Sequence, residues 1–486
     1  MSYLDLTVTE IHSAILEGKV TPFDLVKEAL LRAKNDDNNA FEYIYEQEAL
    51  KAVEKLDPNK KNNLYYGIPV VVKDNFSTKD IPTTGSSNIL ANYVPVFSSE
   101  VVLRLESEGA IIIAKSTLDE LAMGGTGTSG HKGTSFNPWD KKKEHLIGGS
   151  SCGSAISVCN NIVPFAIGSD TGDSVRKPAS HGGLVGFKPS WGRISRFGLF
   201  PFATSLDHVA YFTRSVDDSA AALNFLAGHD EKDATSSYRE VENYLSHIND
   251  SVKGKKIAVI RQIMDSISDP IIIDAFNKSV TYLKSKGAIV DYVDVDTDLL
   301  MAIYPTYIII SCAEATSNNA NLDGIKFGKR MPGNTYEEVI TNTRTAGFSE
   351  LIKRRFVIGS FSLLKENREE LFTRAQRCRR LIVNAINDVF KSYDAIYLPA
   401  SPSTAPLVKG SSSDKLSSEY LIADNHLAIG NFGGFPSITL PIGFKEGLPF
   451  GANITCRPFE ETNLFTIAKE VENGTGLKNI SAKEDK

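Results

Sequence analysis

The sequence of 486 residues predicts an α/β fold in which helices cover both faces of an internal sheet. Short, continuously apolar runs that are rich in β-branched residues alternate along the chain with helical or glycine-rich segments. Most of these runs lack the alternation of polar and apolar residues that half-exposed antiparallel strands show. One stretch also has the pattern of a complete strand–helix–strand crossover. Both observations favour a sheet that lies inside the fold.

The first two predicted elements are helices. Thr7 and Glu10 have the spacing of a capping box, in which each residue satisfies a backbone N–H group of the other. Thr21 and Pro22 have the pattern of a second helix start, because proline is favoured at the first helical position. The Asn- and Asp-rich residues 35–39 then end that helix.

Seven compact apolar runs that follow these helices predict strands. They cover residues 68–72, 110–114, 162–167, 257–260, 288–295, 395–398 and 438–440. The crossover consists of a strand over 256–260, a helix over 271–286 and the strand over 288–295. The closing residues 480–486 predict a short polar tail.

Bulk composition excludes several classes of function. The chain is 42% hydrophobic and 23% charged, and its net charge of −6 argues against direct binding of nucleic acid. The amino terminus lacks the pattern of a secretion signal, and no later stretch approaches the length of a membrane span. We therefore expect a cytoplasmic protein without membrane contact. The five cysteines lack paired CxxC spacing, which argues against a disulfide framework or a metal site.

The glycine- and serine-dense region 124–198 predicts a functional site, because so many flexible residues cost entropy unless the backbone must approach something closely. Residues 125–130 match the GxGxxG fingerprint of dinucleotide sites, but the preceding residues 117–123 predict a helix where the fingerprint requires a strand. Residues 149–153 match the GxSxG nucleophile elbow, which needs a histidine base. The histidines available for that role lie in no context that marks a base; they are His181, His208 and His426.

Three other segments, at 67–75, 148–155 and 168–179, contain a lysine after an apolar strand, a GGSS turn and a DTGDS turn. Together they resemble the amidase signature family, in which the lysine and one serine from each turn form a catalytic triad. The matching residues are Lys73, Ser150 and Ser174. The resemblance implies an α/β/α sandwich with a central mixed sheet, formed by a single domain over 1–486. Its catalytic core covers about 67–215, and substrate-side helices with the remaining strands cover about 216–470.

These residue types suit amide hydrolysis. Lysine removes a proton only when it is neutral, and burial of Lys73 after an apolar strand lowers its pKa towards working pH. Ser150 then relays a proton between Lys73 and Ser174, and Ser174 attacks the amide carbon. Backbone N–H groups are expected to hold the oxyanion, and the residues that carry them are Gly172, Asp173 and Val175.

Segments outside that core are similar to one branch of the family, the A subunits of glutamyl-tRNA(Gln) amidotransferases. They cover residues 118–124, 186–199, 205–207 and 313–324. In that branch the amidase releases ammonia from glutamine, a B subunit uses ATP and Mg2+ to make Gln-tRNA(Gln), and a small C subunit braces the pair. The resemblance implies the same partners here, with tRNA held through the B subunit and no cofactor in this chain.

The resemblance also implies which residues contact glutamine. Arg355 matches the residue that binds the α-carboxylate, and Asp424 matches the residue that binds the α-ammonium group. A guanidinium fork suits a carboxylate, and a carboxylate suits an ammonium group. Arg354 is adjacent and is an alternative to Arg355. Met123 and Gly124 are expected to complete the substrate site.

The chain departs from the family pattern close to the nucleophile. Cys152 and Asp173 stand where the family has glycine, and Asp173 directly precedes Ser174. A carboxylate at that position opposes the negative charge that develops during attack. Lys177 stands where the family has glutamine, so one hypothesis is that an Asp173–Lys177 ion pair neutralises the local charge. Two other functions stay open: a stand-alone amidase for another small amide, and a scaffold protein whose triad has decayed.

Overall fold

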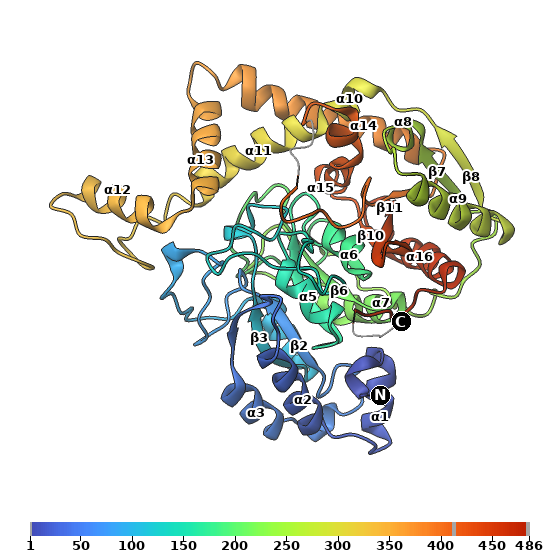
Figure 1. Ribbon diagram of the computed structural model, residues 1–486, viewed down its shortest axis with the longest axis horizontal. Coiled ribbons are helices and arrows are strands. Elements are labelled where there is room, and N and C mark those ends of the chain that lie inside the picture. Colours follow the sequence, from blue (N-terminus) through green and yellow to red (C-terminus); the bar gives the residue numbers. More distant parts are fainter. Residues whose placement is uncertain (1, 411–414, 483–486) are drawn as a thin grey trace.

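The strands of the protein join into one mixed sheet, seen in a computed structural model that describes residues 2–410 and 415–482 (Figure 1). Within these residues the sheet has eleven strands, in the order β1-β3-β2-β4-β6-β5-β10-β11-β9-β7-β8. Their bounds are β1 Phe41–Ile44, β2 Pro69–Lys73, β3 Ile111–Ser116, β4 Phe165–Asp170, β5 Val185–Lys188, β6 His208–Thr213, β7 Lys256–Ile260, β8 Ile289–Val293, β9 Ala395–Pro399, β10 Ser437–Lys445 and β11 Leu448–Cys456. The predicted α/β class with a mixed sheet is confirmed.

Two groups of strands are parallel. β2 pairs in parallel with β3 and β4, and β7 pairs in parallel with β8 and β9. Between these groups, β6, β5, β10 and β11 pair antiparallel with their neighbours. Each of the seven predicted runs lies on or overlaps a strand, but the sequence patterns did not predict β1, β5, β6 and β11. β1 pairs with a strand far away in the sequence, whereas β11 directly follows its partner β10, and all four have weak patterns of their own.

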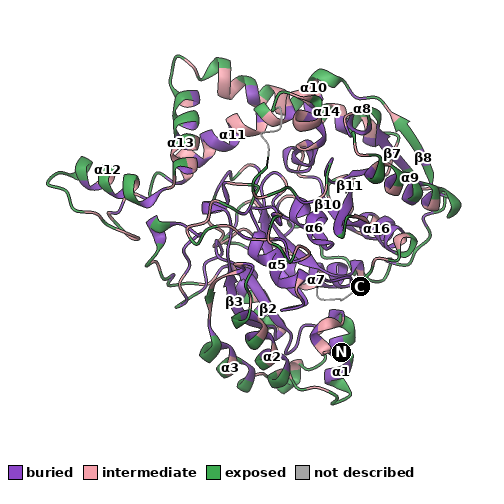
Figure 2. Ribbon diagram, in the orientation of Figure 1, coloured by how far each residue is buried: buried purple, intermediate pink, exposed green. Residues whose placement is uncertain are grey.

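Helices cover both faces of the sheet, as β5 demonstrates. A Cβ atom on Gly186 would lie 2.5 Å from the Ala179 side chain in α6, whereas the Phe187 ring centroid lies 4.8 Å from that of Phe465 in α16. Adjacent residues of a strand point to opposite faces, so α6 and α16 lie on opposite sides of the sheet. Figure 2 shows central strands such as β2, β3 and β11 buried, whereas the edge strand β8 and the outward helix faces are exposed. The helices are α1 Val8–Leu16, α2 Pro22–Lys34, α3 Glu46–Glu54, α4 Glu100–Glu108, α5 Cys152–Cys159, α6 Arg176–Gly182, α7 Val216–Leu226, α8 Arg261–Asp265, α9 Pro270–Ser285, α10 Thr297–Met301, α11 Ile303–Asn318, α12 Tyr336–Gly347, α13 Glu350–Leu363, α14 Arg374–Phe390, α15 Ile429–Phe432 and α16 Glu461–Thr475.

Local sequence signals position the first helices and the crossover as predicted. The Thr7 side chain accepts a hydrogen bond from the backbone N–H of Glu10, and the Glu10 carboxylate accepts one from the backbone N–H of Thr7, 2.9 Å away. Thr21 caps α2, which begins at Pro22. The strand–helix–strand unit is also present, since β7 and β8 are parallel and α9 connects them. These elements form where local capping and periodicity agree with the tertiary fold.

The predicted helix over 117–123 is not present. Only a 3-10 turn, Glu120–Ala122, forms there, and Leu121 has a φ of 52°, which no right-handed helix allows. The buried Glu120 carboxylate accepts hydrogen bonds from Ser87 Oγ at 2.5 Å and from the backbone N–H of Ser349 at 3.1 Å. Contacts with residues distant in sequence therefore determine the backbone conformation here, and the local helical pattern does not.

Part of the predicted carboxy-terminal tail is packed into the fold. Ile480, Ser481 and Ala482 are buried. Ser481 Oγ accepts a hydrogen bond from Asn161 Nδ2 at 2.9 Å, and the backbone N–H of Ala482 donates to the carbonyl of Cys159 at 3.0 Å. Residues 480–482 are therefore anchored, contrary to the prediction, and residues 483–486 lie outside the described residues.

The expectation that no stretch approaches the length of a membrane span was wrong. Residues 297–318, which form α10 and α11, are long and apolar enough for one by length and composition alone. Ile310, Cys312 and Ala315 of α11 are buried, and α11 packs against α13 and α14. The apolar side chains of this stretch are therefore used in helix packing within the fold.

Candidate active site

Lys73, the last residue of β2, is fully buried among three serine hydroxyls. Its Nζ atom lies 2.8 Å from Ser150 Oγ, 2.9 Å from Ser151 Oγ and 2.9 Å from Ser169 Oγ. Burial lowers the pKa of Lys73 to about 7, although surrounding acidic groups favour the charged form. A substantial share of the amine is therefore neutral near pH 7 and able to accept a proton.

The sheet topology brings these hydroxyls together. β2 and β4 are parallel neighbours, so Lys73 and Ser169 lie at the same edge of the sheet. The Ser150–Ser151 turn precedes α5, and Ser151 Oγ donates a hydrogen bond to the Ser169 carbonyl at 3.1 Å. A Cβ atom on Gly168 would lie 2.9 Å from Ser151 Oγ, so glycine permits this close approach. The sequence motifs suggested Ser151 only as the serine of a nucleophile elbow and did not indicate a role for Ser169, because their contacts with Lys73 depend on the pairing of β2 with β4.

Ser174 is buried in the loop between β4 and α6. Its backbone carbonyl accepts a hydrogen bond from the backbone N–H of Ser151 at 3.2 Å, so this loop packs directly on the serine turn. The three residues of the predicted triad therefore lie in one buried cluster. Within it, Lys73 directly contacts Ser150, and Ser174 lies on the adjoining loop.

A buried ion pair, which the sequence motifs did not reveal, fixes the shape of that loop. Arg176 Nη2 lies 2.9 Å from Asp170 Oδ1, and Arg176 Nε donates to Asp170 Oδ2 at 3.1 Å. The same guanidinium donates to the Gly172 carbonyl at 2.8 Å and to Asn431 Oδ1 at 2.7 Å. Although burial opposes ionisation, Arg176 holds the pKa of Asp170 well below its usual range. The ion pair therefore connects Asp170, at the start of the loop that carries Ser174, with Arg176 at its end.

One of the predicted oxyanion donors is engaged elsewhere. The backbone N–H of Val175, the residue directly before α6, donates to Asp170 Oδ2 at 3.0 Å, so this carboxylate occupies the N–H group. The prediction for Val175 therefore does not fit this structure. The backbone N–H groups of Gly172 and Asp173 make no hydrogen bond to another described residue and stay the predicted donors.

Residues 149–153 do not form a nucleophile elbow with a histidine base among the described residues. Lys73 is the basic group bonded to Ser150 and Ser151, while His181, His208 and His426 make no hydrogen bond to either serine in the described part of the chain. Cys152 is buried, its Sγ atom lies 3.6 Å from the carbonyl of Thr117, and burial raises its pKa to about 11. A thiol in that state is a packing group.

Backbone N–H groups of the glycine-rich residues 125–130 bind a carboxylate of the protein itself. The Asp119 carboxylate accepts backbone hydrogen bonds from Thr126, Gly127, Thr128 and Ser129, at 2.9 to 3.1 Å. A loop of converging N–H groups is a general anion cradle, and here a side chain fills it. Because Asp119 occupies these N–H groups, the structure does not support a dinucleotide site here.

Met123 and Gly124 lie near the Ser150–Ser151 turn, because Asp119 contacts both Gly124 and that turn. Met123 is buried, and a Cβ atom on Gly124 would lie 2.4 Å from the Asp119 carboxyl carbon. The backbone N–H of Asp119 donates to the Ser150 carbonyl at 3.1 Å. Both residues are therefore near the cluster, and their predicted contact with substrate stays a prediction.

Of the two candidate arginines, Arg355 is the one suited to bind an anion. Arg354 is exposed, whereas Nε and Nη1 of Arg355 are buried without a hydrogen-bond partner among the described residues. The guanidinium lies 5.8 Å from the centre of the Phe202 ring, and burial raises the pKa of Tyr307 while the charge of Arg355 opposes this shift. A Cβ atom on Gly172 would lie 2.9 Å from the Tyr307 ring, so Tyr307 connects Arg355 to the loop of the nucleophile. A half-buried guanidinium with two buried, unpaired nitrogen atoms favours a carboxylate ligand.

Asp424, the predicted partner of the substrate ammonium group, is bound to a lysine of the protein. Lys177 Nζ lies 3.2 Å from Asp424 Oδ1 and donates to the Asp424 carbonyl at 2.6 Å. The same ammonium lies 2.9 Å from Asp173 Oδ2. The hypothesis of an Asp173–Lys177 ion pair therefore agrees with the structure, and Asp424 belongs to the same cluster.

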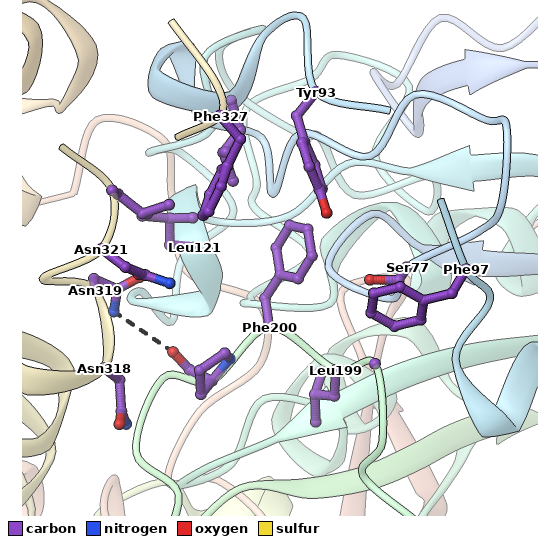
Figure 3. A pocket seen from close by; sticks show the side chains of 14 residues that line it. Ser77, Tyr93, Phe97, Leu121, Leu199, Phe200, Asn318, Asn319, Asn321 and Phe327 are labelled. Atoms are coloured by element: carbon purple, nitrogen blue, oxygen red, sulfur yellow. Dashed lines mark hydrogen bonds between the residues drawn. The ribbon is translucent and has the colours of Figure 1, made fainter. Parts of the chain in front are cut away.

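A separate cavity of about 280 Å3 lies between the 198–201 segment and the end of α11 (Figure 3). Tyr93 packs against Phe200 and Phe327, with ring centroids 6.1 and 5.5 Å apart. Figure 3 also shows the amides of Asn318 and Asn319 at its rim. Among the residues that the structure describes, no charged side chain and no member of the Lys73 cluster lines this cavity, so it lacks the groups that glutamine binding requires.

The fold and the buried lysine–serine cluster are those of an amidase. The family model described as amidase matches residues 24–465, and the chain belongs to this family. The A subunit of glutamyl-tRNA(Gln) amidotransferase from Agathobacter rectalis is 37% identical, and the match covers 100% of this chain and 97% of that protein. The A subunit of the same enzyme from Pediococcus pentosaceus is 36% identical over 98% of each chain.

Solved structures agree with this grouping. The crystal structure of the A subunit of glutamyl-tRNA(Gln) amidotransferase from Thermotoga maritima has a TM-score of 0.82 and 32% identity, covering 100% of this chain and 99% of that one. A protein from a vestigial complex related to the origins of an s-triazine catabolic enzyme has a TM-score of 0.83 and 25% identity, covering 98% of this chain and 100% of that one. Proteins with other activities therefore share the fold, and the site must decide the substrate.

Proposed function

We propose that this chain is the amidase component of a glutamyl-tRNA(Gln) amidotransferase and hydrolyses glutamine to glutamate and ammonia. One observation carries the proposal: Lys73 lies within hydrogen-bond distance of Ser150, with a pKa of about 7, beside the loop of Ser174. The full-length similarity to relatives named as A subunits of this enzyme supports this choice among amidases.

The reaction proceeds through an acyl-enzyme. Neutral Lys73 accepts the Ser150 proton, Ser150 Oγ accepts the Ser174 proton, and Ser174 Oγ forms a bond to the amide carbon of glutamine. The N–H groups of Gly172 and Asp173 stabilise the oxyanion. The proton returns through Ser150 to the amide nitrogen as its bond to carbon breaks, and ammonia leaves. Water then attacks the ester by the same relay and releases glutamate.

Charged groups around the nucleophile select the substrate. The unpaired Nε and Nη1 atoms of Arg355 bind the α-carboxylate of glutamine. Asp424 binds the α-ammonium group, and Met123 and Gly124 contact the chain between the two ends. This arrangement favours an amino acid amide over a simple amide, which separates the proposal from a stand-alone amidase.

The remaining steps belong to other subunits. Released ammonia passes to a B subunit that binds ATP, Mg2+ and tRNA, and a C subunit braces the pair in the cytoplasm. The net charge of −6 supports tRNA binding by a partner. Within the described residues, no group of three or more His, Cys, Asp or Glu side chains is placed to hold a metal ion.

The test is a glutamine-dependent Glu-tRNA amidation assay on the chain copurified with its partner subunits. Wild type is expected to form Gln-tRNA(Gln), and Ser174→Ala is expected to abolish glutamine use while ammonia still supports the reaction. A glutamine-like electrophile should label wild type at Ser174 and leave Ser174→Ala unlabelled. Failure to label wild type would support a decayed scaffold, and rapid hydrolysis of simple amides without partners would support a stand-alone amidase.

A further inference from the structure

Three charged side chains gather beside Ser174, two from one turn of the chain and the third from a distant segment. Lys177 lies in the first turn of α6, Asp173 precedes it by one turn, and Asp424 follows the helical turn Glu419–Ala423. The Lys177 side chain is 10% exposed, against 22% for Asp173 and 33% for Asp424. The lysine is therefore the covered centre of the cluster, and the two carboxylates face the solvent side.

The three N–H donors of the Lys177 ammonium group match the three acceptors around it. These acceptors are Asp173 Oδ2 at 2.9 Å, Asp424 Oδ1 at 3.2 Å and the Asp424 carbonyl at 2.6 Å. Burial opposes the charge on Lys177, but Asp173 and then Asp424 outweigh burial and raise its pKa. The lysine therefore stays an ammonium group and is fully used within the protein.

Each carboxylate keeps one oxygen for a ligand. Asp173 Oδ1 and Asp424 Oδ2 make no hydrogen bond to another described residue. One ammonium between two carboxylates leaves a single net negative charge. Without Asp173, the pair of Lys177 and Asp424 would be neutral, and a substrate ammonium group would have to compete with Lys177 for Asp424.

We propose that Asp173 is a second carboxylate contact for the α-ammonium group of the substrate, and that Asp173 and Lys177 form a compensating pair. Lys177 positions Asp424, and Asp173 restores the negative charge that Lys177 removes. The ion pair also draws the charge of Asp173 Oδ2 towards Lys177, which limits its effect on the oxyanion at Ser174. The substrate class is therefore a primary amide that carries a free α-ammonium group.

This inference rests on the proposed function, and one set of kinetics tests the two separately. The full-length chain, copurified with its partner subunits, is assayed with glutamine and with 4-carbamoylbutanoate, which is glutamine without its α-amino group. The variants are Asp173→Gly, Asp173→Asn, Lys177→Gln, Lys177→Arg and the double variant Asp173→Gly with Lys177→Gln.

Loss of the Asp173 charge is expected to raise KM for glutamine about tenfold, since one ionic contact to a partly exposed group is lost. Asp173→Asn keeps the shape of the side chain and is expected to behave like Asp173→Gly. KM for 4-carbamoylbutanoate should change much less than KM for glutamine in either variant, because this substrate has no ammonium group.

Lys177→Gln leaves two unpaired carboxylates beside the oxyanion and should lower kcat for both substrates about tenfold. Lys177→Arg keeps the charge and should retain most of kcat. The double variant leaves Asp424 as a single free carboxylate and should return KM for glutamine to within about threefold of wild type.

Two results would overturn the proposal. Equal changes in KM for both substrates in the Asp173 variants would indicate a purely structural role, and additive losses in the double variant would exclude compensation. Binding of glutamine by Ser174→Ala carrying each change, measured by calorimetry, gives the same comparison if a variant loses turnover. Absence of glutamine hydrolysis by wild type would instead refute the proposed function, and this inference with it.

Discussion

Lys73 gains its reactivity from its position, because an ordinary lysine in water keeps its proton until about pH 10. Burial at the end of β2 lowers its pKa to about 7, and three hydroxyls replace water around the amine. The hydroxyls of Ser151 and Ser169 orient the amine without carrying charge. The buried amine of Lys73 is therefore sufficient to serve as the base that the proposed reaction needs.

The pH dependence of the reaction should follow Lys73. Only the neutral amine accepts a proton, so kcat/KM for glutamine is expected to rise as pH increases through about 7 and to level off above it. Steady-state assays between about pH 6 and pH 9 measure this profile. Lys73→Arg, which stays charged throughout, should be inactive at every pH; a flat wild-type profile would contradict the role of Lys73.

Cys152 is the residue most easily mistaken for a nucleophile. Its thiol is buried with a pKa of about 11, so Cys152→Ala is expected to retain at least about half of the wild-type kcat. Glutamine hydrolysis by Cys152→Ala and by Ser174→Ala, measured side by side, checks this. Loss of activity in Cys152→Ala with labelling of Ser174 unchanged would contradict the assignment.

The start of α6 is the element on which the site depends. Asp170 ends β4, Arg176 begins α6, and their paired side chains enclose the residues 171–175 that contain the nucleophile. Asn431 joins the pair from α15 through Arg176 Nη2. A strand, a short helix and a distant helix therefore fix one loop, which local sequence alone cannot do.

Arg176→Lys should show what this pairing contributes. Lysine cannot reproduce the fork that binds Asp170 and the Gly172 carbonyl together, so the loop should shift and kcat should fall about a hundredfold. The free energy of unfolding should also fall by about 3 kcal/mol. Glutamine hydrolysis and urea denaturation measure the two effects. An unchanged labelling rate at Ser174 would show that the ion pair does not position the nucleophile.

In the molecule as a whole, the two ends of the described chain lie in contact. Asn479 Nδ2 donates to the Asp5 carbonyl at 2.9 Å, and the backbone N–H of Asn479 donates to the Arg214 carbonyl at 2.8 Å. Residues 480–482 continue beneath the end of α5. The carboxy-terminal segment therefore closes the core around the helix that follows Ser150 and Ser151.

Truncation after residue 479 should destabilise the protein by about 3 kcal/mol, because it exposes the site of Ile480 and removes two hydrogen bonds. Thermal and urea denaturation measure the change. The matched control ends after residue 482, so the difference between the two truncations isolates residues 480–482. Equal stabilities would show that this segment does not contribute to the fold.

The extent of sequence-based prediction differed between the strands and the site. Strands such as β2 and β7 were predicted because their apolar runs are strong, whereas β5 and β11 contain glycine or proline and depend on their partners. The chemistry of Lys73 and Ser150 was expected from the sequence, and the structure places them 2.8 Å apart. The contact of Ser169 with Lys73 could not be predicted, because it requires the pairing of β2 with β4. The contacts of Arg176 and Val175 could not be predicted either, because they require the folded shape of the loop after β4.

The sequence by itself determined the α/β class, the capped helices and the residue types of an amide-cleaving site, because capping, periodicity and motif spacing are local properties. Tertiary structure decided which of these groups meet. It selected Arg355 over Arg354 by burial, occupied the Val175 N–H with Asp170, and placed Lys177 between Asp173 and Asp424. Some of these contacts, such as that of Lys177 with Asp424, join residues hundreds of positions apart, and the local ones depend on the shape of the loop after β4, so only the packed fold sets their distances.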